Sequence, residues 1–217
     1  MLQDFGLYIV MTKPVLGYNA FTQICVEEAI PMLQLRDKHF GDRALYELSC
    51  ELQGITKGSE TRFILNDNPL VAQLAGVDGL HLGPEDLSPQ HALQVYSAKR
   101  ILGLSSHSTA EATSIIGDYH NASYGIKPDY LSFGPIFPTP TKAIPDAPVG
   151  TDQLKSVISI APMPIVAIGG IYPENIISVL QTGARNIAMV RYFMQADSKS
   201  ELRLRITEIR SIIKENR

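Results

Sequence analysis

The sequence predicts an α/β fold, namely a (β/α)8 TIM barrel that forms a single domain over residues 1–217. Short runs rich in Ile, Val, Leu, Phe and Tyr recur along the chain, and segments with helical periodicity lie between them. This alternation is typical of a parallel sheet whose strands are joined by helices. Eight such runs are enough to close a barrel, and an open doubly wound sheet is the second choice.

The eight apolar runs are the predicted strands. Each ends at a polar residue or a glycine, and a short continuous apolar run is typical of a strand that is buried on both faces. In chain order the predicted strands cover residues 7–10, 32–36, 62–66, 79–83, 100–105, 130–134, 165–169 and 186–191.

Four of the intervening segments carry clear helix signals. Residues 41–55 have apolar side chains at helical spacing, and residues 198–217 alternate charge with Leu and Ile, as in an amphipathic terminal helix. A Ser-Pro pair opens residues 88–96, and residues 108–119 begin with a serine that is followed by a glutamate at capping distance. No linker, low-complexity tract or repeat interrupts the pattern, so we expect one domain.

Composition and charge restrict the function classes. The chain is 45% hydrophobic, and its net charge of −3 gives no basic field for nucleic acid or an anionic membrane. Its apolar runs are much shorter than the roughly 20 residues of a membrane-spanning helix, and its first residues lack a secretion signal. We therefore expect a cytoplasmic protein that binds small molecules and keeps Cys25 and Cys50 reduced; a homo-oligomer is left open.

Charged residues follow several predicted strands, at the rim where a barrel carries its catalytic groups. Carboxylates can hold a diphosphate together with Mg²⁺, while lysine and arginine neutralise its remaining charge. The alternative is a set of rim salt bridges, which any barrel can have. The cations are Arg36, Lys38 and Lys142, and the carboxylates are Asp67, Glu85 and Asp86.

Glycines and histidines near the strand ends allow two interpretations each. Gly169 and Gly170 either let the backbone approach a phosphate or supply the positive φ of a tight turn. His81 lies inside a strand, where we expect a hydrogen-bonded core histidine rather than a catalyst. His107 is either an acid or base of the site or a structural group. The sequence contains no dinucleotide-binding glycine motif, no P-loop motif and no zinc-ligand spacing.

Six motifs resemble, in order and near spacing, those of the thiamin phosphate synthase family. The resemblance extends from residue 7 to residue 190. It implies a (β/α)8 barrel that joins hydroxymethylpyrimidine diphosphate to thiazole phosphate and releases diphosphate, with Mg²⁺ as cofactor. The motifs are QLRDK (34–38), ND (66–67), HLGPEDL (81–87), GLSSHS (103–108), GPIFPTPTK (134–142) and VAIGGI (166–171).

The resemblance also implies the roles of individual residues at the pyrimidine diphosphate. Gln34 would hydrogen-bond the aminopyrimidine, and Asp67 and Asp86 would ligate Mg²⁺. The diphosphate would be held by Arg36, Lys38, Asn66, Ser105 and Lys142, and we expect Arg36, Lys38, Ser105 and Lys142 to be catalytic.

Four residues are implied at the thiazole phosphate. Thr139 and Thr141 would contact this phosphate from the GPIFPTPTK segment, whose prolines restrict its backbone. Gly169 and Gly170 would offer backbone N–H groups to it.

Two residues depart from the family pattern. Pro84 stands where the family usually has Gln, and Arg191 stands where it tends to have a small Ser. Arg191 could pair with a phosphate or could narrow the pocket. Two other functions stay open: a thiazole tautomerase with a histidine such as His107 as proton shuttle, and a non-catalytic barrel that binds a phosphate ligand. Neither needs the full set of diphosphate and Mg²⁺ residues, so the synthase is favoured.

Overall fold

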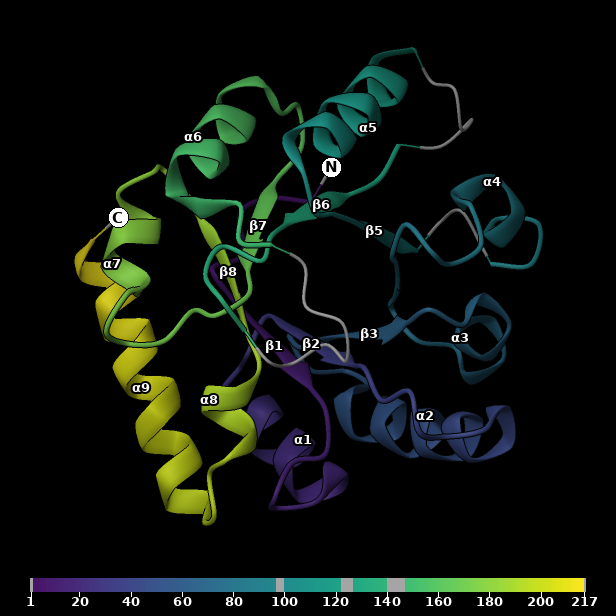
Figure 1. Cartoon of the computed structure of the whole chain (residues 1–217). Helices are drawn as coiled ribbons and strands as arrows, with labels where there is room; N and C mark the ends of the chain where they lie inside the picture. The colour runs from purple at the N-terminus through teal and green to yellow at the C-terminus, as the bar shows by residue number, and fades with distance from the viewer. Residues whose placement is uncertain (1, 97–99, 122–126, 140–146, 217) are drawn as a thin grey trace.

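The strands form a closed and fully parallel barrel. The computed structural model describes residues 2–96, 100–121, 127–139 and 147–216. Neighbouring strands pair in sequence order, and β8 pairs with β1 to close the ring, which confirms the predicted (β/α)8 barrel. Figure 1 shows the helices arranged around the outside of this ring.

The strands agree closely with the predicted ones. Each begins within one residue of the predicted position and ends within two. The largest difference is at β8, which ends at Met189, so that Arg191 begins a helix instead of ending the strand. The strands are β1 Leu7–Met11, β2 Met32–Leu35, β3 Arg62–Asn66, β4 Gly79–Leu82, β5 Ile101–Ser106, β6 Tyr130–Phe133, β7 Ile165–Ile168 and β8 Asn186–Met189.

Helices with the predicted caps connect the strands. The serine hydroxyl of Ser108 accepts a hydrogen bond from the backbone N–H of Glu111 at 3.1 Å, as the capping pattern predicts. The Ser-Pro signal predicts one helix over residues 88–96, but only Pro89–Ala92 is helical, and residues 94 and 95 continue in turns whose N–H groups donate to the carbonyls of His91 and Ala92. The described helices are α1 Tyr18–Glu27, α2 Asp42–Thr56, α3 Pro69–Ala75, α4 Pro89–Ala92, α5 Thr109–Asn121, α6 Gly150–Ile160, α7 Ile176–Leu180, α8 Arg191–Met194 and α9 Lys199–Glu215.

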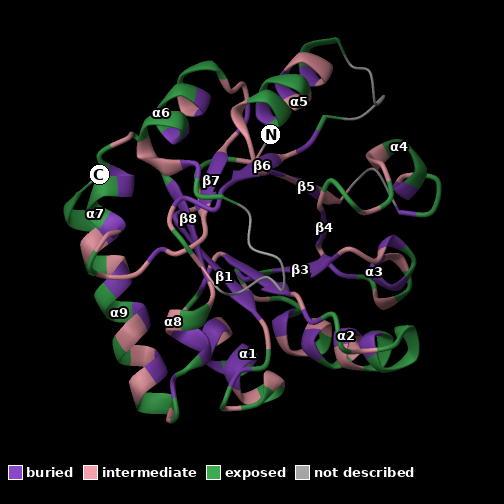
Figure 2. Ribbon diagram, viewed as in Figure 1, coloured by how far each residue is buried: buried purple, intermediate pink, exposed green. Residues whose placement is uncertain are grey.

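Two hydrophobic layers result from the alternation of side chains along each strand. The larger one lies between the strands and the inward faces of the helices, and Figure 2 shows the buried strands inside helices whose outer faces are exposed. The smaller one fills the barrel interior. Its buried members are Tyr8, Val10, Met32, Ile64, Tyr130, Val166 and Ala188.

The barrel interior becomes polar toward the carboxyl ends of the strands. Gln34, Asn66 and Ser132 each lie two residues beyond an apolar interior residue on the same strand, so they point to the same side. All three are buried. A polar layer buried at this end of a barrel lies directly beneath the rim where ligands bind.

Among the described residues, no helix is long and apolar enough to cross a membrane. Cys25 and Cys50 are free thiols on α1 and α2, in agreement with the expectation from the sequence.

Candidate functional site

The structure brings the predicted diphosphate residues of four neighbouring strands to one part of the rim. Gln34 and Asn66 are buried on β2 and β3, and Ser105 is half-buried on β5. Arg36 directly follows β2 and is also half-buried. Register explains why they meet, since Asn66 pairs with His81 on β4, the strand that leads to Asp86.

Asp67 and Asp86 lie side by side, and Lys38 pairs with one of them. The Lys38 Nζ atom is 3.1 Å from Asp67 Oδ2. Burial, followed by the hydrogen bond and negative charge of Asp67, raises the pKa of the Asp86 carboxyl to about 6. Two carboxylates this close repel each other when both are ionised, so the pair is suited to hold a cation.

Backbone geometry directs both carboxylates. Asp67 has φ 67°, a left-handed conformation that aspartate and asparagine tolerate better than most residues. The carboxylate of Asp86 accepts a hydrogen bond from the Gly83 N–H at 2.7 Å, and the Asp86 N–H donates to the Gly83 carbonyl at 3.2 Å. Pro84 occupies the second position of this turn, where proline is favoured, and Glu85 is exposed. The departure at Pro84 therefore fits the turn.

The donor set fits Mg²⁺. This ion usually binds one or two carboxylates together with water and substrate phosphates, rather than a cage made only of protein atoms. Asp67 and Asp86 provide two such oxygen ligands, and within the described part of the chain no group of three or more His, Cys, Asp and Glu forms a competing metal cluster.

A second cluster holds the segment between β2 and α2, and the sequence did not reveal it. The side chain of Asp37 is only 1% exposed and accepts hydrogen bonds from the backbone N–H of His39 at 3.0 Å and its ring at 2.8 Å. The Tyr18 hydroxyl donates to the same carboxylate, and Lys13 Nζ lies 3.1 Å from the other ring nitrogen of His39. This arrangement fixes the turn that carries Arg36 and Lys38.

A chain of hydrogen bonds crosses the buried polar layer beneath the rim. The Gln34 amide nitrogen donates to the Tyr8 hydroxyl at 2.8 Å, and the Tyr8 and Tyr130 hydroxyls are 2.9 Å apart. His81 joins Tyr130 to Ser105, with its Nδ1 atom 2.9 Å from the Tyr130 hydroxyl and its Nε2 atom 2.7 Å from the Ser105 Oγ atom. Ser105 is also 3.1 Å from the Ser132 hydroxyl.

His81 is therefore the hydrogen-bonded core histidine that the sequence predicts. Burial is the main reason that its pKa is lowered to about 4, so the imidazole is neutral at pH 7. His81 also contacts Ser105, a candidate site residue on the rim. The prediction of a core histidine does not include this contact.

Gly169 and Gly170 form a close backbone contact between β7 and the segment after β6. Both have positive φ, 98° and 67°, and a Cβ atom on Gly169 would lie 2.5 Å from the Pro135 Cα atom. The backbone N–H groups of Ile136 and Phe137 donate to the carbonyls of Ile168 and Gly169 at 2.9 and 3.0 Å. Packing and turn geometry alone therefore require glycine here, and phosphate binding remains a prediction.

His107 also belongs to this contact. Its Nδ1 atom is 2.8 Å from the Gly134 carbonyl oxygen, so the ring donates from this nitrogen. The contact supports the structural interpretation of His107 and fixes the start of the GPIFPTPTK segment. Thr139 is half-buried just beyond it, whereas Thr141 and Lys142 lie outside the described residues.

Arg191 lies at the first position of α8 and is exposed. It follows Val190, one residue past the end of β8, so it remains near the rim but on a helix of four residues. Both alternatives for Arg191, pairing with a phosphate and narrowing the pocket, stay predictions.

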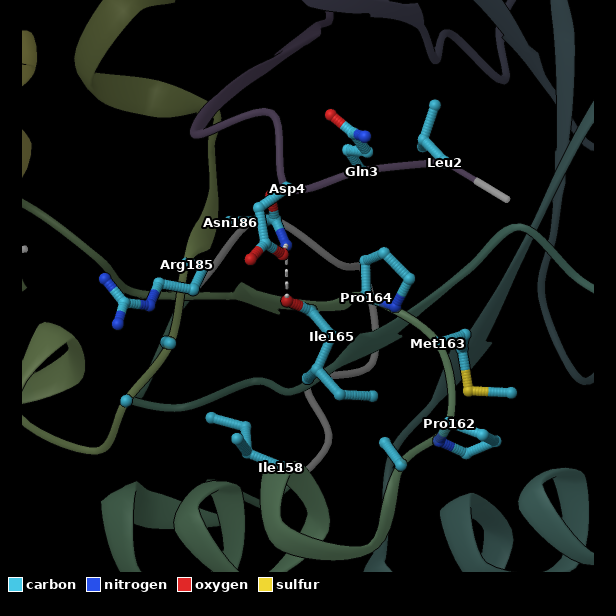
Figure 3. Close-up of a pocket in the computed structure, with 13 residues that line it drawn as sticks. Leu2, Gln3, Asp4, Ile158, Pro162, Met163, Pro164, Ile165, Arg185 and Asn186 are labelled. Carbon is cyan, nitrogen blue, oxygen red and sulfur yellow. Dashed lines mark hydrogen bonds between the residues drawn. The ribbon is translucent and has the colours of Figure 1, made fainter.

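A hollow of about 610 Å³ lies at the opposite end of the barrel, where β7 and β8 begin. Figure 3 shows it between the N-terminal segment at Leu2–Asp4 and the residues that precede and open the two strands, with Arg185 and Asn186 on one side. A smaller hollow of about 250 Å³ adjoins the start of β1. Neither hollow includes a candidate site residue, so we assign the site from the rim geometry and not from cavity size.

Comparisons with known proteins agree with this geometry. A family model described as thiamine monophosphate synthase matches residues 7–193. The thiamine-phosphate synthase of Persephonella marina is 33% identical over 212 residues, covering 95% of this chain and 96% of the relative. That of Chloroflexus aurantiacus is 33% identical over 216 residues, covering 98% and 95%.

A solved structure described as thiamine phosphate pyrophosphorylase from Pyrococcus furiosus superimposes with a TM-score of 0.83 at 28% identity, covering 98% of this chain and 97% of that one. A 3-hexulose-6-phosphate synthase shares only the fold, with a TM-score of 0.63 at 14% identity. With the family match extending over most of the barrel, the chain belongs to the thiamine monophosphate synthase family.

Proposed function

We propose that this chain is a thiamin phosphate synthase, a transferase that couples hydroxymethylpyrimidine diphosphate with thiazole phosphate. The observation that carries the proposal is the Asp67–Asp86 carboxylate pair, with Lys38 at 3.1 Å from Asp67, on the same rim as the buried amide of Gln34. Cations and a carboxylate pair that can hold a metal suit the charged diphosphate. A buried amide suits the uncharged aromatic ring, to which it can hydrogen-bond.

At the pyrimidine end, Gln34 binds the aminopyrimidine from the barrel interior. The Gln34 side chain is 3% exposed, so its hydrogen bond to a ligand is formed away from water and discriminates strongly between bases. The diphosphate then extends over the rim. Arg36 and Lys38 neutralise its charge, and Asn66 and Ser105 donate hydrogen bonds to its oxygens.

At the metal end, Asp67 and Asp86 would hold Mg²⁺. When bound, the ion supplies positive charge that stabilises the leaving diphosphate. Burial first, and then the hydrogen bond and negative charge of Asp67, raise the pKa of Asp86, and a bound cation would offset both effects by favouring the ionised carboxylate.

At the other end of the site, Thr139, Thr141, Gly169 and Gly170 bind the thiazole phosphate, and Lys142 reaches the diphosphate. The backbone contact between Gly169 and Phe137 supports this arrangement, because it brings the segments after β6 and β7 together. A ligand held between Thr139 and Gly169 would therefore touch both segments close to this backbone contact.

The reaction balances without a protein base. The bond between the pyrimidine methylene carbon and the diphosphate oxygen breaks, and its electron pair leaves with the diphosphate. The resulting pyrimidine cation is stabilised by the ring amino group. The lone pair of the thiazole nitrogen then forms the new carbon–nitrogen bond, and no proton is lost. The residues of this chain therefore act by orienting the two substrates and by stabilising charge.

The test is to supply the folded protein with both substrates and Mg²⁺ and to measure thiamin phosphate. Formation of the product supports the proposal, and a folded protein that makes none contradicts it. Isomerisation of a thiazole phosphate in the absence of the pyrimidine diphosphate would instead favour a tautomerase.

Lys142→Ala is the variant that tests the assignment at the opposite side of the diphosphate. Loss of one positioned charge at a leaving group costs about 3 kcal/mol of transition-state stabilisation, so we expect kcat to fall roughly a hundredfold. Near-normal turnover in a folded variant would show that Lys142 does not contact the diphosphate.

A further inference from the structure

In the buried row of hydrogen bonds beneath the rim, one direction gives every proton an acceptor. The amide nitrogen of Gln34 can only donate, so the Tyr8 hydroxyl accepts from it at 2.8 Å. The Tyr8 proton is then available to the Tyr130 oxygen at 2.9 Å. In this direction Tyr130 gives its own proton to Nδ1 of His81, which is also 2.9 Å away.

The direction continues through the imidazole. A neutral histidine that accepts at Nδ1 carries its proton at Nε2. The Nε2–H group therefore donates to the Ser105 Oγ atom at 2.7 Å. Because Ser105 already accepts from His81, its own proton points elsewhere, either to the Ser132 hydroxyl at 3.1 Å or to a ligand on the rim.

We propose that Tyr8, Tyr130 and His81 are positioning residues that set the hydrogen-bonding direction of two substrate contacts at once, Gln34 and Ser105. This inference rests on the proposed function and deepens it. This direction of the hydrogen bonds leaves the side-chain carbonyl oxygen of Gln34 to accept from an amino group. It also leaves the Ser105 hydroxyl to donate to an anionic oxygen. An aminopyrimidine diphosphate offers an amino group at one end and anionic oxygens at the other.

The opposite direction would not suit this ligand. If Ser105 donated to His81, its oxygen lone pairs would face the diphosphate, and Gln34 would turn its NH₂ group toward the amino group of the pyrimidine. Both contacts would then be repulsive. A buried network is costly to leave partly unpaired, so the direction at one end fixes the direction at the other.

The packing around Tyr130 holds the chain in place. Tyr130 is fully buried and stacks on His81, with ring centroids 5.5 Å apart and an interplanar angle of 19°. Its ring fills the space that the absent side chain of Gly103 leaves, since a Cβ atom there would lie 2.0 Å from Tyr130 Cζ. The Tyr8 and Tyr130 rings pack edge to face at 5.8 Å.

Tyr130→Phe tests the proposal because it removes only the hydroxyl in the middle of the chain. We expect the KM for the pyrimidine diphosphate to rise roughly five- to tenfold, as for one lost buried hydrogen bond, with the KM for thiazole phosphate unchanged. Tyr96→Phe is the matched control, since Tyr96 is equally buried and its hydroxyl donates to the Ile101 carbonyl outside the chain. Equal effects of the two variants would overturn the proposal.

A double-mutant cycle separates positioning from general stability. In a Gln34→Ala background, Tyr130→Phe should change kcat/KM less than it does in the wild type, because the part of its effect that acts through Gln34 is lost while the part through Ser105 remains. Fully additive effects would overturn the proposal. Tyr8→Phe breaks the same chain one link earlier and takes the place of Tyr130→Phe in both tests if that variant does not fold.

A measurement on the wild type is independent of activity. Nitrogen NMR of ¹⁵N-histidine protein, with the His81 signals identified by their loss in His81→Gln, reports which ring nitrogen carries the proton. We expect Nε2, and a proton on Nδ1 would overturn the proposal. A wild type that makes no thiamin phosphate would contradict the proposed function instead, while the NMR result would still decide the direction of the chain.

Discussion

At Asp67 the backbone adopts a left-handed conformation, and the side chain meets both Asp86 and Lys38. Such a conformation is sparsely populated and costs energy, so it persists where the surroundings hold it. Here the Asp67 N–H donates to the His81 carbonyl at 2.9 Å, and the Asn68 N–H donates back to Asn66. The turn thereby places the Asp67 carboxylate beside Asp86 in the turn after β4, which is the geometry that a shared cation needs.

Asp86→Asn should weaken Mg²⁺ binding while leaving the fold intact. We expect the Mg²⁺ concentration for half-maximal activity to rise roughly tenfold or more, because the variant removes one of two anionic ligands. A titration of activity against Mg²⁺ measures this shift.

Glu85→Gln is the matched control for that titration. Glu85 is the adjacent carboxylate in sequence, but it is exposed at the tip of the turn. Its replacement should leave the Mg²⁺ dependence unchanged. If Glu85→Gln and Asp86→Asn shift the titration equally, the metal ligands are misassigned.

The identity of individual site residues was only partly predictable from the sequence. Asp67 was a candidate because it directly follows an apolar run, where a barrel places its ligands, whereas Asp86 was separated from the neighbouring Glu85 only by the family resemblance. The tyrosine chain could not, because Tyr8 and Tyr130 are 122 positions apart and each looks like an ordinary core aromatic residue. Their hydroxyl groups meet across the barrel interior, because the closed barrel turns both side chains inward from strands that are not neighbours.

At the scale of elements, the loops after β1 and β2 stabilise each other through Asp37. Burial raises the pKa of the Asp37 carboxyl, but hydrogen bonds from Tyr18 and from the backbone and ring of His39 outweigh it, so the pKa is lowered overall. A carboxyl with a lowered pKa in the folded state adds stability above its unfolded pKa and loses it as the pH falls through the folded value.

Asp37→Asn should destabilise the protein at neutral pH by about 1–2 kcal/mol, because charge-assisted hydrogen bonds become neutral ones. The difference from the wild type should shrink below roughly pH 4, where the wild-type carboxyl also begins to take up a proton. Urea unfolding at neutral and acid pH measures both. A difference that stays constant with pH would show that the charge of Asp37 is not the cause.

The positions of the strands along the sequence were easier to predict than the individual site residues. Continuous apolar runs gave the strand starts, since a strand covered by helices outside and side chains inside has no polar face. Helix ends were less predictable: the segment after Ser88 has the same Ser-Pro signal as a longer helix but forms only α4. Capping signals mark where a helix starts, whereas packing decides how far it continues.

At the scale of the whole molecule, Asn186 connects the last strand of the barrel to the N-terminal segment that precedes the first strand. Its side chain is fully buried at the start of β8; Oδ1 accepts from the backbone N–H groups of Phe5 and Gly6 at 2.7 and 3.2 Å. Its amide nitrogen donates to Asp4 at 3.0 Å and to the Ile165 carbonyl at 3.3 Å. Together with the β1–β8 pairing, these bonds lead us to propose that residues 1–217 fold as one unit.

Asn186→Ala should lower the free energy of unfolding by about 3 kcal/mol, since it leaves buried backbone donors without acceptors. Activity per folded molecule should not change, because Asn186 lies at the end of the barrel opposite the candidate site. Urea unfolding and kinetics on the same sample test both statements.

Asn216→Ala is the control for this prediction. The Asn216 side chain bonds to the Ile212 carbonyl at the exposed end of α9, so its loss should have little effect. Equal destabilisation by the two variants would mean that Asn186 does not have the special role described.

The ends of the segment between Ile136 and Val149 are bound to each other, since the N–H groups of Val149 and Gly150 donate to the carbonyls of Pro135 and Ile136 at 2.8 and 3.2 Å. These two bonds join the residues that flank the loop on either side. Because the entropic cost of closing a loop grows only slowly with its length, we expect that this segment can be replaced by one of another length with little loss of folding stability. Grafting the corresponding segment of a relative should then change substrate preference while leaving the melting temperature nearly unaltered.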